Sequence, residues 1–166
     1  MFSFSRRPWQ DTELLTSLGE GTATLSEPHD PKLFFAGGAT LFVWPNFTKR
    51  VVQHAQEVRS APPLSYRTYE LKKSAWSDDI RHQLPETHLF QPDDLWFIAD
   101  LIGAQRHGGG GPLLIDSGVG NVFYVEIHSV VHQIGVYWWE GRLRIGSLDP
   151  ADEPVDAGHR IFAKLS

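Results

Sequence analysis

Apolar residues recur at helical spacing in two early stretches of the chain. The first covers residues 11–18, where Asp11 can cap a helix and Gly19 can end it. The second begins at Asn46 or Thr48 and runs to about residue 59. Both stretches predict amphipathic helices, and the second has one apolar stripe formed by Val51, Val52, Ala55 and Val58.

Two later helices are predicted where acidic residues occupy a first turn, because the helix dipole favours negative charge there. One starts at Ser77 and the other at Pro92, a residue that suits a first turn. Asp100 interrupts the second helix, either as a buried carboxylate paired with Arg106 or His107 or as its one solvated position. We expect this helix at the centre of the core because its other positions are apolar, namely Leu95, Trp96, Phe97, Ile98, Ala99, Leu101 and Ile102.

An apolar segment with a glycine pair in its middle predicts a hairpin. Leu33–Ala36 and Ala39–Trp44 flank Gly37-Gly38, and glycine reaches the positive φ values that a tight turn requires. Both faces of this hairpin are apolar, which indicates an interior position in a sheet. Further strand-like runs predict strands at Thr22–Leu25, Ser65–Leu71, Leu113–Ile115, Val122–Ile127, Val130–Trp139, Arg142–Leu148 and Arg160–Ala163. Of these, Ser65–Leu71 has mixed polarity.

The order of these elements indicates the α+β class. Helices and strands do not alternate regularly along the chain, as they would in a parallel α/β fold. The short strands of the last third, joined by tight connections, are typical of an antiparallel meander. We therefore predict a mainly antiparallel sheet with a C-terminal β-meander and three or four helices packed on it, in a single domain over residues 1–166.

The composition supports a packed core and narrows the function. The 166 residues suit one domain, and 41% of them are hydrophobic. The chain contains no cysteine, which excludes disulfides, thiolate metal sites and a cysteine nucleophile. Its net charge is −5 and its 15 basic residues are scattered, so we expect no nucleic-acid partner.

The N-terminal sequence and the apolar runs bear on location. MFSFSRRPWQ places its aromatic residues before its arginines, whereas a secretory signal has the reverse order and a longer apolar core. The longest nearly apolar run, residues 33–44, is shorter than the ~20 residues that span a bilayer. We expect a soluble cytoplasmic protein with no membrane contact.

The glycine-rich stretch HGGGGPLLIDSGVGN, residues 107–121, carries the signatures of two hydrolases. Its HGGG matches the oxyanion loop of many lipases, which supplies only backbone N–H donors and depends on a Gly-x-Ser-x-Gly nucleophile turn. The chain contains no such pentapeptide. The simpler interpretation is a flexible glycine connection from the preceding helix into Leu113.

The second signature, Leu-Leu-Ile-Asp116-Ser117-Gly118, resembles the active-site loop of retropepsin-like proteases. The resemblance implies a homodimer in which two copies of Asp116 share a proton and activate a water molecule. It covers about six residues and departs from the family at Val119, in the absence of a convincing flap hairpin, and in the poor later counterpart at residues 144–146. The alternative is a hairpin loop in which Asp116 and Ser117 bond to nearby backbone and Gly118 takes an unusual dihedral.

His128 and His132, with Glu126 nearby, have a spacing that metal ligands can use. The HExxH order is absent, however, and a chain reversal near Ser129 would separate the two rings. We therefore predict surface or hydrogen-bonded histidines, and we expect neither a metal nor a cofactor.

The C-terminal third carries two features that are typical of binding surfaces. Neighbouring strand residues point to opposite faces, so Trp138 and Trp139 cannot both enter the same core. One large aromatic residue is then left as an interface anchor, unless a second layer covers it. The segment DPADEPVD follows with four acids and no base, which suits a basic partner or a solvated loop stiffened by two prolines.

These observations favour a non-catalytic binding module, of the immunity or inhibitor type, that contacts a protein partner. The alternative is a homodimeric aspartic hydrolase in which Asp116 is catalytic. The predicted binding residues are Tyr137, Trp138, Trp139, Asp149, Asp152, Glu153 and Asp156.

Overall fold

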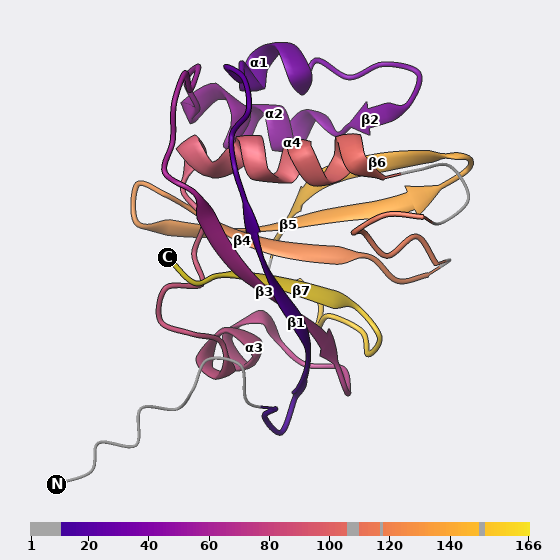
Figure 1. Cartoon of the computed structure of the whole chain (residues 1–166). Helices are drawn as coiled ribbons and strands as arrows, with labels where there is room; N and C mark the ends of the chain where they lie inside the picture. The colour runs from indigo at the N-terminus through magenta and orange to yellow at the C-terminus, as the bar shows by residue number, and fades with distance from the viewer. Residues whose placement is uncertain (1–10, 106–109, 117, 150–151) are drawn as a thin grey trace, which may run out of the picture.

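The computed structural model describes residues 11–105, 110–116, 118–149 and 152–166. Figure 1 shows its sheet, in which seven strands lie in the order β1-β3-β7-β4-β5-β6-β2. The strands are β1 (Leu15–Ala23), β2 (Leu41–Val43), β3 (Leu64–Leu71), β4 (Asn121–Ile127), β5 (Val130–Trp139), β6 (Arg142–Leu148) and β7 (Arg160–Lys164). The helices are α1 (Pro31–Phe34), α2 (Pro45–Arg50), α3 (Ser77–Gln83) and α4 (Leu95–Ala104), with short 3-10 turns η1 (Val52–His54) and η2 (Pro92–Asp94).

The sheet is mixed, which corrects the expectation of a mainly antiparallel one. β4 pairs with β7 and β2 pairs with β6 in parallel, whereas the other four neighbouring pairs are antiparallel. The α+β class is confirmed, and β4, β5 and β6 form an antiparallel meander in chain order. Its turns are tight because His128, Ser129, Glu140 and Gly141 adopt positive φ values. Hydrophobic periodicity locates strands but not their neighbours, so it carries no signal for the two parallel pairings.

Two core layers lie on opposite faces of the sheet. On one face, here called the α4 face, Phe123 and Val125 pack with buried residues of α2 and α4. On the other, the α3 face, Val122 and Tyr124 pack with Ile80 of α3. Figure 1 shows α1, α2 and α4 gathered on one side of the sheet and α3 apart from them. No helix in the described ranges is long and apolar enough to cross a membrane.

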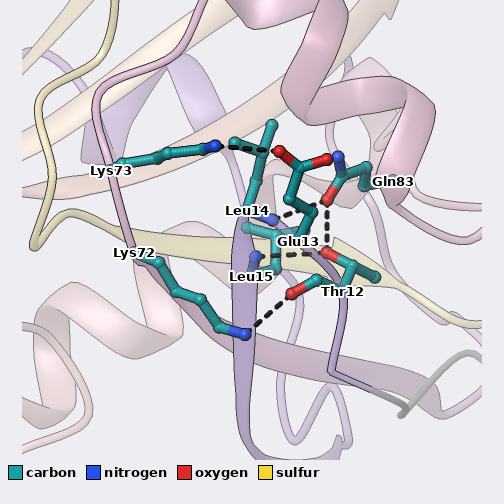
Figure 2. A network of polar contacts seen from close by, with 7 residues as sticks. All are labelled: Thr12, Glu13, Leu14, Leu15, Lys72, Lys73 and Gln83. Atoms are coloured by element: carbon teal, nitrogen blue, oxygen red, sulfur yellow. Dashed lines mark hydrogen bonds and ion pairs between the residues drawn. The ribbon is translucent and has the colours of Figure 1, made fainter.

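Residues 11–18 do not form the predicted helix but a loop and the start of β1. Figure 2 shows the reason, which is a contact with the end of α3. Gln83 Oε1 accepts from the backbone N–H of Leu14 at 2.8 Å and from the hydroxyl of Thr12. Thr12 Oγ1 in turn accepts from the N–H of Leu15 at 3.1 Å. Because side chains take these backbone donors, tertiary contacts override the weak helical preference of a short stretch.

The predicted hairpin at residues 33–44 is also wrong. Its first arm lies in α1, whose N-cap Asp30 accepts from the N–H of Lys32 at 3.0 Å and from that of Leu33 at 3.4 Å. This arm is not a strand of the sheet, and it exposes Leu33 at 76% while Phe35 is buried in the core. The second arm contains β2, which lies at the sheet edge and pairs with β6. The pair Asp30-Pro31, which comes just before the apolar run, is a signal for the start of a helix that the hairpin prediction did not use.

The two central helix predictions have different outcomes. The stretch from 46 to 59 forms only α2 and η1, so the helix begins at Pro45 and ends well before residue 59. Its apolar stripe still faces the core, since Val51, Val52 and Ala55 are buried. α4 confirms the other prediction, because all seven of its apolar residues named above are buried. Asp100 is exposed and therefore not a buried carboxylate, but Gly103 and Ala104 at the end of the helix are exposed as well.

Residues 113–115 do not form the predicted strand, yet a single side chain holds them beside the sheet. Asn121 Oδ1 accepts from the N–H of Leu114 at 2.8 Å. Asn121 Nδ2 donates to the carbonyls of Leu114 and Val136, each at 2.9 Å. The amide thus makes the pair of hydrogen bonds to Leu114 that a neighbouring strand would make. A periodic apolar pattern gives no indication of such a side-chain contact.

The buried His88 links the stability of the fold to pH. Its Nδ1 lies 2.7 Å from the carbonyl oxygen of Pro85, and its Nε2 accepts from Arg81 Nε at 3.2 Å. This arrangement suits a neutral ring, whose Nδ1–H donates to Pro85. Burial, reinforced by the charge of Arg81, lowers the pKa of His88 below its usual value of 6.5. Burial also lowers the pKa of His29 and of His132.

We expect the free energy of unfolding to fall on acidification. In the unfolded chain these histidines bind protons near their ordinary pKa, whereas in the folded chain they bind protons only at lower pH. The stabilisation is therefore complete above about pH 6.5 and declines as the pH falls below it. Urea titrations at neutral and mildly acidic pH measure how steeply the free energy of unfolding falls with decreasing pH. His88→Gln should make this dependence on pH shallower. A slope that is unchanged in that variant would show that His88 is protonated as readily in the folded state.

Candidate functional site

A pocket of about 380 Å³ opens on the α3 face of the sheet, beside β5 and the segment that follows β6. This segment runs from β6 to β7 and must pass β5 and β4, because those strands lie between them in the sheet. The crossing brings the hairpin and the acidic segment together, although they are separate in the sequence. The residues lining the pocket include all seven predicted for binding, Tyr137, Trp138, Trp139, Asp149, Asp152, Glu153 and Asp156.

Alternation along β5 decides which aromatic side chains reach the pocket face. Ile134 and Val136 belong to the core layer under α4, and Trp138 packs against that layer. Tyr137 and Trp139 therefore point to the α3 face, where Trp139 is 50% exposed. The two tryptophans thus separate to opposite faces, and Trp139 is the exposed one.

Tyr137 is held in place by Trp44, which follows β2. The indole Nε1 of Trp44 donates to the Tyr137 hydroxyl at 2.7 Å. The indole also lies against Gly146, where an added Cβ would come within 2.9 Å of Trp44 Cδ1. Trp44 is itself 40% exposed, so the aromatic surface continues from the pocket toward the β2 edge.

Next to this surface, two arginine side chains already pack on an aromatic ring. The guanidinium carbons of Arg142 and Arg144 lie 4.9 Å and 5.1 Å from the ring centroid of Phe42. Strand register places Phe42 beside Arg144, and Arg144 beside Tyr137, on the α3 face. The contact between guanidinium and aromatic ring is therefore part of the native surface chemistry here.

The acidic side of the pocket is anchored by Val155. Its N–H donates to the carbonyl of Ala75 at 2.8 Å, and its carbonyl accepts from the N–H of Ala75 at 3.0 Å. The described lining residues include four acids and one histidine but no lysine or arginine. Within the described ranges, no ion pair involves the exposed Asp152, Glu153 or Asp156. The uncompensated carboxylates give the pocket a negative potential that favours a cation.

A polar side chain, Gln133, lies in the pocket lining and is only 4% exposed. Its Oε1 accepts from the hydroxyl of Ser77, whose Oγ accepts from the Tyr124 hydroxyl at 3.3 Å. Burial raises the pKa of Tyr124 to about 12, so the phenol stays a donor at neutral pH. Among the described residues, no acceptor lies within hydrogen-bond range of Gln133 Nε2. That donor is therefore available to a group that enters the pocket.

The other candidate site, Asp116, does not line this pocket. It is exposed in a segment without regular secondary structure, whereas the resemblance implies an aspartate at the end of a strand. Gly118 has a φ of +83°, as the loop interpretation requires. Ser117 and residues 106–109, including His107, lie outside the described residues. The dimeric hydrolase requires a second chain and stays a prediction.

Histidines gather near the β4–β5 turn. The ring of His128 lies 5.3 Å from that of His54, centroid to centroid. His132 lies on β5 opposite Val125, and the charges of Arg50 and His54 add to the effect of burial in lowering its pKa, so His54 lies near both histidines. In the part of the chain that the structure describes, no three or more histidine or acidic side chains are arranged to hold a metal ion.

Sequence reasoning missed several residues that shape the pocket. A count of every second residue along β5 would have placed Gln133 and Gly135 on the same face as Trp139. No comparable signal leads to Trp44, because strand order alone brings it to Tyr137. His159 lies only three residues after Asp156, so its place in the lining follows from the acidic segment.

The chain matches no protein-family model, and no curated protein or solved structure matches it at a significant level. The chemistry of the pocket is therefore the basis of the proposed function.

Proposed function

We propose that the chain is a non-catalytic binding module that contacts a basic protein partner through its C-terminal hairpin and the acidic segment after β6. The proposal rests on one observation. A half-exposed tryptophan, Trp139, lines a pocket whose described lining holds four acids and no lysine or arginine. A role of the immunity or inhibitor type, in which this surface covers a basic enzyme, fits that chemistry.

Two physical arguments favour binding by this surface. Large aromatic residues supply much of the energy of protein interfaces, and surrounding charges steer the partner toward them. Both parts of the site are held before any partner arrives, by Trp44 on Tyr137 and by Val155 on Ala75. A preformed surface loses less conformational entropy on binding.

The test compares partner capture by the native chain and by a surface variant. Trp139→Ala combined with Asp152→Asn, Glu153→Gln and Asp156→Asn should weaken a purified partner's affinity by about 2 kcal/mol or more, roughly thirtyfold. The four side chains are exposed, so the melting temperature should stay within a few degrees of the native value. The partner is identified by quantitative affinity capture with both proteins and then titrated in purified form.

A matched control is Glu86→Gln, which neutralises an exposed acid that is not part of the pocket lining. This variant should capture the partner as well as the native chain does. Equal capture by the native chain and the fourfold variant would refute the proposed surface. Loss of folding in the fourfold variant would assign these residues a structural role instead.

A further inference from the structure

We infer that the pocket takes an arginine side chain, presented by an exposed peptide segment of the partner. The guanidinium would lie between the aromatic side, Tyr137 and Trp139, and the acids of the following segment. A main-chain carbonyl of the same segment would accept from Gln133. This inference rests on the proposed function, because it names the group that the partner inserts.

The charge balance of the pocket selects a cation. Asp152, Glu153 and Asp156 line it as exposed carboxylates that take part in no ion pair within the described ranges, and its described lining contains no lysine or arginine. The backbone of Val155 is hydrogen-bonded to that of Ala75, so the acidic segment is held in place between Glu153 and Asp156. An incoming cation therefore meets several carboxylates at once, without the cost of first ordering a free loop.

The aromatic side of the pocket favours guanidinium over ammonium. A guanidinium group is planar, stacks on aromatic faces and presents five donors to several carboxylates. An ammonium group is compact and more strongly hydrated, so its transfer to this surface costs more. A contact of this kind is already present on the adjoining surface, where the guanidinium carbons of Arg142 and Arg144 lie 4.9 Å and 5.1 Å from the ring centroid of Phe42.

The buried amide of Gln133 distinguishes a peptide from a simple amine. Its Oε1 is occupied by Ser77, whereas its Nε2 has no acceptor among the described residues. The side chain is 4% exposed, but Nε2 is not among the buried atoms that lack a partner, so this donor can be reached from the pocket. A peptide carbonyl satisfies it, and a bare organic cation does not.

The size of the pocket suits one residue with its flanking peptide groups. Its volume of about 380 Å³ is near the lower end of the range for small-ligand sites, about 300 to 1,000 Å³. Gly135 contributes to this space because it places no side chain on the pocket face. An added Cβ there would meet only Leu148 Cδ1, at 3.4 Å. Gly135 therefore offers a way to fill the pocket without removing any lining side chain.

The experiment titrates the full chain with four small probes and follows Trp139. The probes are N-acetyl-arginine amide, the corresponding lysine and citrulline amides, and butylguanidinium, which keeps the guanidinium and the single charge but lacks the carbonyls. The readout is the nuclear magnetic resonance shift of the Trp139 indole N–H, assigned by its loss in Trp139→Phe. The arginine amide should bind with a dissociation constant in roughly the millimolar range, as expected for so small a ligand.

Selectivity and variants then test each part of the inference. The lysine amide and butylguanidinium should each bind several-fold more weakly than the arginine amide, and the citrulline amide should not bind. Gly135→Val should weaken arginine binding about tenfold or more, because it fills the pocket. Asp152→Asn combined with Glu153→Gln and Asp156→Asn should do the same, whereas Glu86→Gln should leave binding unchanged.

Three results would overturn the inference. They are no shift of Trp139 with the arginine amide, equal binding of the lysine or citrulline amide, and equal binding by Gly135→Val in its folded state. A partner whose affinity still depends on Trp139 and the acids would leave the proposed function intact in each case. Loss of that dependence would instead refute the proposed function, so the two failures are distinguishable.

Discussion

Replacing Asn121 with alanine is expected to lower the free energy of unfolding by about 3–5 kcal/mol. The side chain is 1% exposed and makes three hydrogen bonds of 2.8–2.9 Å to the backbone of Leu114 and Val136. Alanine removes this side-chain partner from three backbone groups in or near the core, and each lost hydrogen bond of this kind costs up to about 1–3 kcal/mol. Urea unfolding followed by circular dichroism measures the change.

Asn46 provides a matched comparison. Its amide donates to the carbonyl of Ser147 at 2.7 Å and accepts from the N–H of Ser147 at 3.2 Å, at the partly buried edge of β6. Asn46→Ala should therefore cost less, about 1–2 kcal/mol. Equal losses at the two positions, or a loss at Asn121 below about 1 kcal/mol, would contradict the assigned role of Asn121.

Local patterns predicted elements well where the elements were long and regular. α4 was predicted because eight of its ten residues are apolar and Pro92 marks the preceding turn. β4, β5 and β6 were predicted from strand-like runs broken at tight connections. Local patterns failed at residues 11–18, where the backbone N–H groups of Leu14 and Leu15 bond to side chains instead of to a helix. They failed again at residues 33–36, where a capping aspartate outweighs an apolar run.

Strand order lies beyond any local pattern. The pairings of β2 with β6 and of β4 with β7 join segments that are far apart in the chain. Their register follows from packing of the two core layers, and no single stretch of sequence contains that information. The prediction of a mainly antiparallel sheet was wrong for this reason.

The candidate site could be predicted from the sequence only in part. Alternation along β5 predicted that Trp138 and Trp139 would separate, and charge alone indicated the acidic segment. That these two features line one pocket depends on the crossing from β6 to β7 over β5. The roles of Trp44 and Gln133 depend on partners 93 and 56 residues away in sequence, Tyr137 and Ser77 respectively. Sequence patterns alone therefore identify candidate residues but not the pocket that these residues line together.

Replacing Phe97 with alanine is expected to lower the free energy of unfolding by about 3–5 kcal/mol. Phe97 joins α4 to the sheet, with ring centroids 4.8 Å from Tyr66, 5.5 Å from Phe90 and 6.5 Å from Phe123. It is fully buried, so alanine removes apolar contacts and leaves a cavity among rings that cannot close around it. Asp100→Ala on the exposed side of the same helix should change stability by less than about 0.5 kcal/mol. Urea titrations of both variants measure the contrast, and equal stabilities would mean that α4 does not bury this face against the sheet.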